Sequence, residues 1–217
     1  SILYPIKYPN AYKNQIINRG IILEGPPGTG KTLLAEALAN EADAHFIGIN
    51  GLEMESKWVG ESEENWRDLF KEAKDNSPTI IFIDEFDAVA RSRGDGPSGG
   101  NKHDDKVVNQ LLTLMSDVEK GKFGNTFVIV TTNKVDLLDE AITRSGRFGK
   151  KITMKAPQTV KDCRTLFDIH TKSKPLSESI DKDDFAEKLL NAKTTGADVS
   201  HITGEAYQNS LERLGIN

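Results

Sequence analysis

A run of glycines followed by a lysine and a threonine is the part of the sequence with the clearest chemistry. Residues 25–32 read GPPGTGKT, which matches the spacing G-x-x-x-x-G-K-[ST]. In this pattern glycines let successive backbone N–H groups turn toward phosphate oxygens, and the helix that follows adds the partial positive charge of its N-terminus. Lys31 is expected to reach the β- and γ-phosphates of ATP, and the Thr32 hydroxyl is expected to ligate Mg²⁺. The candidate nucleotide-binding residues of this segment are Pro27, Gly28, Thr29, Gly30, Lys31, Thr32 and Leu33.

Two adjacent carboxylates follow a strongly apolar run. Residues 80–85 read IIFIDE, so Asp84 and Glu85 lie at the carboxyl end of an expected buried strand. Asp84 is suited to hold Mg²⁺ together with Thr32, and Glu85 is suited to polarise an attacking water. Because each role needs its own carboxylate, the pair indicates hydrolysis of the nucleotide rather than binding alone.

A sheet and its helices must position these residues. Short β-branched runs alternate with longer helical patterns, which is typical of parallel strands joined by crossover helices. Several runs are continuously apolar, as expected where helices cover both faces of a sheet. The expected strands are Gly20–Leu23, His45–Asn50, Thr79–Asp84, Thr126–Thr131 and Lys151–Met154, and the expected helices between them are Lys31–Glu41, Glu61–Asp75 and Asp104–Val118.

The pattern becomes purely helical after Pro157. We therefore predict an α/β fold class, with a three-layer α/β/α core around a parallel sheet in residues 1–156 and a small C-terminal helical subdomain in residues 157–217. Residues 94–101 (GDGPSGGN) are rich in turn formers and are expected to form a loop. The expected C-terminal helices are Val160–Thr171, Asp183–Asn191 and Asp198–Leu214.

The composition is that of a globular chain without a basic excess. Hydrophobic residues make up 37% of the 217 residues, and the net charge is −5. No stretch approaches the roughly 20 apolar residues that span a bilayer, and no signal-peptide pattern opens the chain, so we expect a soluble, cytoplasmic protein without a transmembrane segment. The acidic balance gives no reason to expect a nucleic-acid partner. The single cysteine, Cys163, cannot form an internal disulfide and is expected to be a partly buried helix residue.

Seven sequence blocks together resemble the AAA family of ATPases, in particular the hexameric modules of the group that includes valosin-containing protein and the N-ethylmaleimide-sensitive factor. The blocks follow one another in the family order, and the resemblance runs from about Tyr8 to the C-terminus. It implies the P-loop NTPase fold with a C-terminal helical lid. The blocks are GPPGTGKT (25–32), SKWVGESE (56–63), IIFIDEFDAV (80–89), KVVNQLLTLM (106–115), TTNKVDLLDEAI (131–142), TRSGRF (143–148) and GADVSHIT (196–203).

The resemblance assigns further catalytic residues. Asn133 matches the polar sensor that lies near the γ-phosphate in this family, although an asparagine there could also cap the following turn. Arg144 and Arg147 match the arginine fingers that reach the ATP of a neighbouring subunit. The resemblance therefore implies a homo-oligomer, a hexamer, whose active sites are shared between subunits. Catalysis would then involve Lys31, Asp84, Glu85, Asn133, Arg144 and Arg147.

The resemblance also assigns a contact with a polypeptide substrate. Lys57, Trp58 and Val59 match the first pore loop, whose aromatic residue grips an extended polypeptide in the central channel of the ring. A tryptophan packed under the following helix is the plainer alternative for Trp58. Trp66, in contrast, shares helical spacing with Leu69 and Phe70 and is expected in the core.

Three residues of the C-terminal part match nucleotide contacts of the family. His170 matches a histidine that contacts the nucleotide, although a lone histidine is more often a structural residue. Gly196 and Ala197 match the lid motif that approaches the adenine and ribose, and Asp198 is expected to cap the last helix.

The sequence departs from the family pattern mainly on the side that faces a neighbouring subunit. Gly149 stands where the family usually has Asp, and Ser145 where it often has Pro. The segment that begins with Ser116-Asp117-Val118 replaces the usual Asp-Gly turn. These departures put coupling between subunits in more doubt than nucleotide binding. Glu24, directly before the glycine-rich segment, is also unusual.

Three functions remain open at this stage. The first is Mg²⁺-dependent ATP hydrolysis coupled to the unfolding or remodelling of proteins threaded past Trp58. The second is an ATP-gated oligomerisation or scaffold module that does not thread a substrate. The third is the ATPase part of a larger AAA protease; against it, the segment WVGESE differs from the FVG-type segment common there, and the chain has no HExxH motif.

Overall fold

The computed structural model divides the chain into two compact units, which are described separately below. The first, here called the sheet unit, comprises Ser1–Glu24 and Lys31–Thr153, and the second, the helical unit, comprises Gly25–Gly30 and Met154–Asn217. The structure describes residues 3–12, 15, 17–53, 62–88, 102–133, 142 and 147–215, with side chains left out at 62, 63 and 102–107. The assignment of residues 1–156 and 157–217 to two domains stays a prediction.

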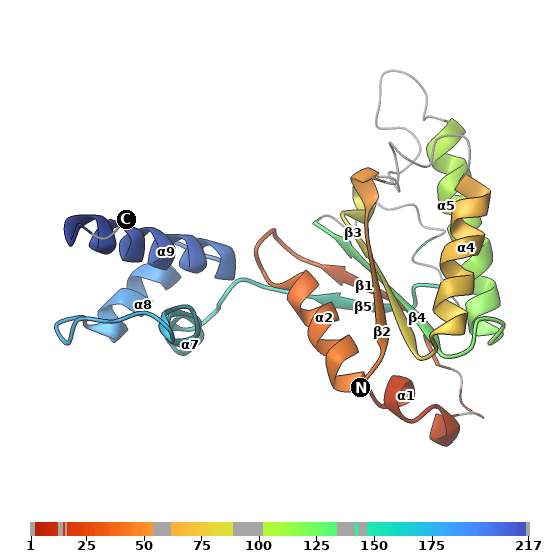
Figure 1. Cartoon of the computed structure of the whole chain (residues 1–217), viewed down its shortest axis with the longest axis horizontal. Helices are drawn as coiled ribbons and strands as arrows, with labels where there is room; N and C mark the ends of the chain where they lie inside the picture. The colour runs from red at the N-terminus through yellow and green to blue at the C-terminus, as the bar shows by residue number, and fades with distance from the viewer. Residues whose placement is uncertain are drawn as a thin grey trace. The chain divides into compact units, whose positions relative to one another are not determined.

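Five parallel strands form the sheet of the sheet unit, in the order β2-β3-β4-β1-β5. Helices cover both of its faces, which confirms the predicted α/β fold class (Figure 1). Each strand bound lies within one residue of its expected position. The strands are β1 (Gly20–Glu24), β2 (His45–Asn50), β3 (Thr79–Asp84), β4 (Thr126–Thr132) and β5 (Lys150–Thr153).

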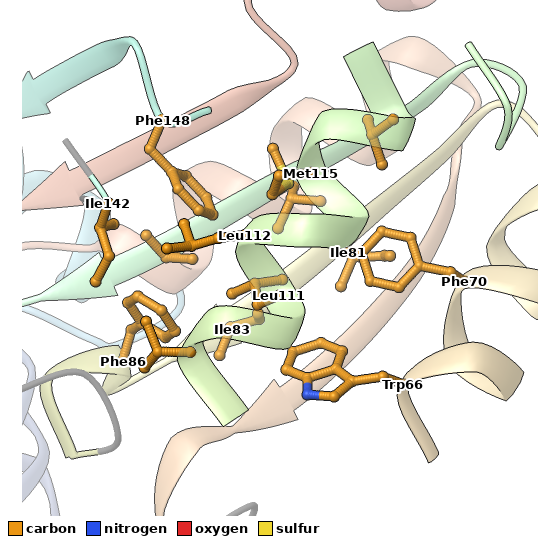
Figure 2. Packing of buried hydrophobic residues seen from close by; sticks show 14 of the residues in the cluster. Trp66, Phe70, Ile81, Ile83, Phe86, Leu111, Leu112, Met115, Ile142 and Phe148 are labelled. Carbon is orange, nitrogen blue, oxygen red and sulfur yellow. The ribbon is translucent and has the colours of Figure 1, made fainter. Parts of the chain in front are cut away.

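Alternate residues of each central strand pack against different helices, because successive side chains of a strand point to opposite faces. On one face Ile81 and Ile83 join the residues of α4 and α5, including Trp66 and Phe70 (Figure 2). On the other face Ile80 and the neighbouring strand residues join the alanines of α2. Trp66 and Phe70 are fully buried, with ring centroids 6.0 Å apart, which confirms their predicted place in the core.

The helices of the sheet unit agree with the expected ones to within a few residues, apart from short additions. The sequence did not predict the N-terminal segment, in which a five-residue helix buries Ile6 in the same cluster as α2. The described elements are α1 (Leu3–Lys7), η1 (Pro9–Tyr12), α2 (Lys31–Ala42), α4 (Ser62–Asp75), η2 (Phe86–Ala88) and α5 (Lys102–Glu119).

The helical unit contains α7 (Val160–Thr171), α8 (Lys182–Asn191) and α9 (Gly196–Arg213). Cys163 on α7 is buried in its core with Phe167 and Val199, as predicted, and burial raises the pKa of its thiol. The prediction that Asp198 caps α9 is wrong, because Thr195 is the N-cap residue. Asp198 is instead the third helical residue and completes a capping box with Thr195.

Among the residues that the structure describes, no helix combines the length and the apolar character that crossing a bilayer requires.

Candidate active site

The carboxyl ends of the parallel strands bring the candidate catalytic residues to one edge of the sheet. Asp84 is the last residue of β3 and pairs with Asn50 at the end of β2. Asn133 follows the last residue of β4, and Glu24 at the end of β1 pairs with Thr132. In open parallel sheets this edge is where ligands bind.

Lys31 and Asn133 contact each other although they are 102 residues apart in the sequence. Lys31 is the first residue of α2, and its Nζ donates a hydrogen bond of 3.0 Å to Oδ1 of Asn133. Burial lowers the pKa of the Lys31 ammonium, while the negative charges of Asp84 and Asp87 act in the opposite direction. The structure thus places a partly desolvated cation beside a polar amide and near two carboxylates.

Asp84 has hydrogen-bond donors on both carboxylate oxygens. The Thr32 hydroxyl donates to Oδ2 over 3.1 Å, and the Thr131 hydroxyl donates to Oδ1. Mg²⁺ prefers hard oxygen ligands, often one or two from the protein together with waters and substrate phosphates. The adjacent oxygens of Thr32 and Asp84 fit that donor set, so these two residues would hold the ion.

Glu85 turns the chain sharply at the end of β3. Its φ is +51°, in the left-handed region that few non-glycine residues adopt, and its side chain is exposed. The backbone N–H of Glu85 donates to Thr131 Oγ1 over 3.0 Å and to Asp84 Oδ1 over 3.1 Å. Local strain of this kind is common at functional sites and persists only where the surroundings enforce it.

Gly51, which directly follows β2, lies against the backbone of Asp84 and Glu85. A Cβ atom built on Gly51 would lie 2.6 Å from the carbonyl oxygen of Glu85 and 3.0 Å from that of Asp84. Because backbone atoms cannot move aside as a flexible side chain can, only glycine fits here. Gly51 was not among the residues singled out from the sequence.

The glycine-rich segment itself belongs to the helical unit, where it meets the start of α9. The backbone N–H of Ala197 donates to the Gly28 carbonyl over 3.3 Å. Gly28 has φ +74°, and a Cβ atom there would lie 2.6 Å from Thr195 Oγ1 and 2.7 Å from Ala197 Cβ. The structure therefore brings together Gly28, Gly196 and Ala197, which the sequence had assigned to nucleotide binding from widely separated segments.

The other described contacts of the glycine-rich segment also lie within the helical unit. The Thr29 hydroxyl donates to the carbonyl of Pro26 over 2.9 Å, which closes a short turn through Pro27. Gly30 has φ +85° and has open space where a Cβ atom would stand.

Three further candidate residues lie on other parts of the described structure. Leu33 on α2 is 70% exposed and lines a groove with Ala37 and Phe46 between α2 and the edge strand β2. His170 lies half-buried in the last turn of α7. Arg147 is half-buried, and its carbonyl oxygen lies against Gly20, at the amino end of β1 and thus at the end of the strand away from Asp84.

Some predicted residues fall outside the described part of the chain. They are the second proposed arginine finger and the first pore-loop residues, namely Arg144, Lys57, Trp58 and Val59. The expected loop of residues 94–101 also falls there.

The segment that departs from the family pattern, Ser116-Asp117-Val118, lies in the last turn of α5 and has a local structural role. Val118 is fully buried in the core, and Asp117 forms an ion pair with Lys122 over 2.8 Å. The Ser116 hydroxyl donates to the Leu112 carbonyl one turn earlier on the helix. These contacts end α5 and fix the turn that leads into β4.

The comparison with protein families matches residues 21–156 to the family described as "ATPase family associated with various cellular activities (AAA)". The matched region begins at the second residue of β1 and ends just after β5, so it contains all of the sheet except Gly20, including the edge that carries Lys31, Asp84 and Asn133.

Several curated proteins are similar to nearly the whole chain. Protein SAV of Sulfolobus acidocaldarius is 44% identical over 213 residues, which cover 97% of this chain and 26% of that protein. The cell division cycle protein 48 homolog of Archaeoglobus fulgidus is 42% identical over 212 residues, covering 97% of this chain and 28% of that protein. ATP-dependent zinc metalloprotease FtsH 3 of Synechocystis is 44% identical over 192 residues, which cover 88% of this chain and 30% of that protein. The chain thus spans less than a third of the length of these relatives.

Proposed function

Because this chain belongs to the AAA family of ATPases, we propose that it binds Mg·ATP and hydrolyses it to ADP and phosphate as one subunit of a ring of identical chains. The observation that carries the proposal is the cluster at the carboxyl edge of the sheet. There Lys31 contacts Asn133, Thr32 contacts Asp84, and Glu85 stands next to them with an exposed carboxylate.

Each residue of the cluster has a role that its chemistry supports. Lys31 and Asn133 face the γ-phosphate and stabilise the negative charge that develops on it. Thr32 and Asp84 hold Mg²⁺, which neutralises phosphate charge when it is bound. Glu85 accepts a proton from the attacking water as the water oxygen bonds to the γ-phosphorus and the bond to the ADP oxygen breaks.

The placement of Arg147 supports action on a neighbouring subunit. Strands rise about 3.3 Å per residue, so roughly 13 Å separates Gly20, where the Arg147 carbonyl lies, from Glu24 at the end of β1. The catalytic cluster lies beyond that end. An arginine at the opposite end of the strand is suited to serve another subunit rather than its own, and a finger supplied in trans is worth about 10³–10⁵ in rate.

Coupling of hydrolysis to the remodelling of a polypeptide is the further part of the proposal. It rests on the resemblance of Lys57, Trp58 and Val59 to a pore loop, and hexameric assembly rests on the same resemblance. The alternative is the third function considered above, the ATPase part of a larger protease. It is supported by the similarity to a protein named as a metalloprotease. Location in the cytoplasm also stays a prediction.

The substitution Glu85→Gln tests hydrolysis, because it removes the proton acceptor and keeps the size of the side chain. We expect ATP affinity within about threefold of wild type and phosphate release reduced by at least about 10²-fold. Both can be measured by titration calorimetry and a coupled phosphate assay at several chain concentrations. Unchanged phosphate release would remove Glu85 from the mechanism.

The substitution Trp58→Ala separates remodelling from scaffolding. Under the remodelling proposal, ATP-dependent unfolding of a tagged test protein is lost while ATP-dependent assembly, measured by light scattering, is retained. If partner-directed activity is indifferent to the substitution, the scaffold function is favoured instead.

A further inference from the structure

Thr131 contacts the Asp84 carboxylate and the backbone of Glu85, yet the sequence block that it opens gives it no role. It is the second-last residue of β4 and only 1% exposed. β4 runs parallel to β3, with Val130 opposite Ile83, so Thr131 comes beside the point where β3 ends. This position brings its hydroxyl to Asp84 and Glu85.

The Thr131 hydroxyl donates to one of these neighbours and accepts from the other. A hydroxyl has one hydrogen to donate and two lone pairs to accept with. It donates to Oδ1 of Asp84 and accepts from the backbone N–H of Glu85, whose nitrogen lies 3.0 Å away. Because the side chain is buried, water cannot replace either partner.

One consequence is a fixed rotation of the Asp84 carboxylate. Oδ1 is engaged by Thr131 and by the Glu85 N–H, and Oδ2 is left to meet the Thr32 hydroxyl at 3.1 Å. The oxygen that faces Thr32 is therefore the one suited to a metal ion. Without the Thr131 hydroxyl, the carboxylate would lose the donor that distinguishes its two oxygens.

The second consequence concerns the backbone of Glu85. Its left-handed conformation, with φ +51°, is unfavourable for a residue with a side chain and must be held by its surroundings. The hydrogen bonds that the Glu85 N–H donates to Thr131 and Asp84 stabilise this conformation. Gly51, which has no side chain, leaves room for the carbonyl group of Glu85. The direction in which the Glu85 side chain leaves the sheet follows from this conformation.

We propose that Thr131 is a positioning residue, whose hydroxyl sets both the rotation of the Asp84 carboxylate and the left-handed turn at Glu85 before a nucleotide binds. The inference rests on the proposed ATP hydrolysis. It differs from a purely structural role, in which the hydroxyl would only satisfy buried polar groups.

The test compares Thr131→Val, which removes the hydroxyl and keeps the shape, with Thr131→Ser, which keeps the hydroxyl. In Thr131→Val we expect kcat to fall about tenfold or more and the KM for ATP to stay within about threefold, because the lost contacts are to the metal-holding carboxylate and the base. Thr131→Ser is expected to recover most of kcat. Without nucleotide, the exchange rate of the Glu85 amide hydrogen, measured by NMR, should rise at least about tenfold in the Val variant only.

Thr126→Val is the matched control, because Thr126 lies in the same strand, is fully buried, and donates its hydroxyl to the Phe123 carbonyl. It should match the thermal destabilisation of Thr131→Val and keep wild-type kcat. The inference is overturned if Thr131→Val keeps wild-type kcat, or if its loss equals that of Thr126→Val. If wild-type turnover is itself absent or insensitive to Glu85→Gln, the proposed function has failed and the inference falls with it.

Discussion

At the scale of single residues, the turn at Asp84 and Glu85 depends on a nearby glycine, because any side chain at that position would collide with the backbone of the turn. Gly51 is buried beside the carbonyls of Asp84 and Glu85. Its substitution by alanine would push a methyl group against backbone, so the turn at Glu85 must shift. We predict that Gly51→Ala lowers kcat by at least about tenfold and stability by about 1–3 kcal/mol.

Gly48→Ala serves as the control, since Gly48 lies in β2 three residues earlier and a Cβ atom there meets only the Phe46 ring edge, at 3.4 Å. Phosphate release and urea unfolding measure the two effects. Equal behaviour of the two variants would show that the Gly51 approach has no bearing on the site.

The candidate residues predicted from the sequence share a property that Thr131 and Gly51 lack. Lys31, Asp84 and Glu85 belong to motifs whose spacing along the chain carries the chemistry. Thr131 is a small polar residue in an apolar strand, and its importance arises only from the pairing of β3 with β4. The sole signal that could have indicated it is that a buried hydroxyl needs partners.

At the scale of the elements, the carboxyl end of β1 is joined to β5 by a polar cluster. Glu24 accepts a hydrogen bond of 2.6 Å from the Thr153 hydroxyl and forms an ion pair with Lys151 over 3.0 Å. The Thr153 hydrogen bond is the largest influence that holds the pKa of Glu24 below its ordinary value; burial opposes it, and Lys151 lowers it further. This gives a structural role to a residue that the sequence left unexplained.

The pH dependence follows from the direction of that shift. A carboxyl group whose pKa is lower in the folded than in the unfolded chain stabilises the fold above the unfolded value, about 4.3, and this contribution is lost as the pH falls through the folded value. We predict that Glu24→Gln lowers stability by about 1 kcal/mol at pH 7, and that its difference from wild type shrinks below about pH 4.

Urea unfolding at several pH values measures that difference. The control is Glu41→Gln, because the Glu41 side chain is 66% exposed and its pair with Lys7, at 3.4 Å, is a surface pair of small effect. A Glu24→Gln difference that stays constant down to pH 3 would contradict the assignment.

The main elements could be predicted from the sequence because their signals are local. The apolar runs of β3 and β4 and the helical spacing around Trp66 identify them without tertiary information. The five-residue α1, which contains a proline, is too short to give such a signal. The start of α9 was misplaced because Thr195 and Asp198 are both good cap formers, and only the geometry shows which one precedes the first helical residue.

At the scale of the whole molecule, the account requires that subunits complete one another's active sites. Arg147→Ala keeps Glu85 but lacks one finger, whereas Glu85→Gln keeps the finger but lacks the base. Each variant alone should release phosphate at least about 10²-fold more slowly than wild type. Mixed in equal amounts, they should recover up to about a quarter of wild-type turnover, because intact Glu85 can meet intact Arg147 across an interface.

A mixture of Glu85→Gln with Lys31→Ala is the control for that experiment. Both substitutions damage the nucleotide side of the interface, so no pairing of these two chains yields a complete site. Recovery in this control, or none in the Arg147 mixture, would contradict the assignment of Arg147 to a neighbouring subunit.

The central claim is that Lys31, at the carboxyl edge of the sheet, is needed to bind Mg·ATP. Titration calorimetry of the wild-type and Lys31→Ala chains with Mg·ATP tests it most directly. The account predicts a saturable complex with the wild type, with affinity at least about tenfold weaker in Lys31→Ala. A wild-type chain that gives no saturable complex, or a Lys31→Ala chain that binds as tightly, would contradict it.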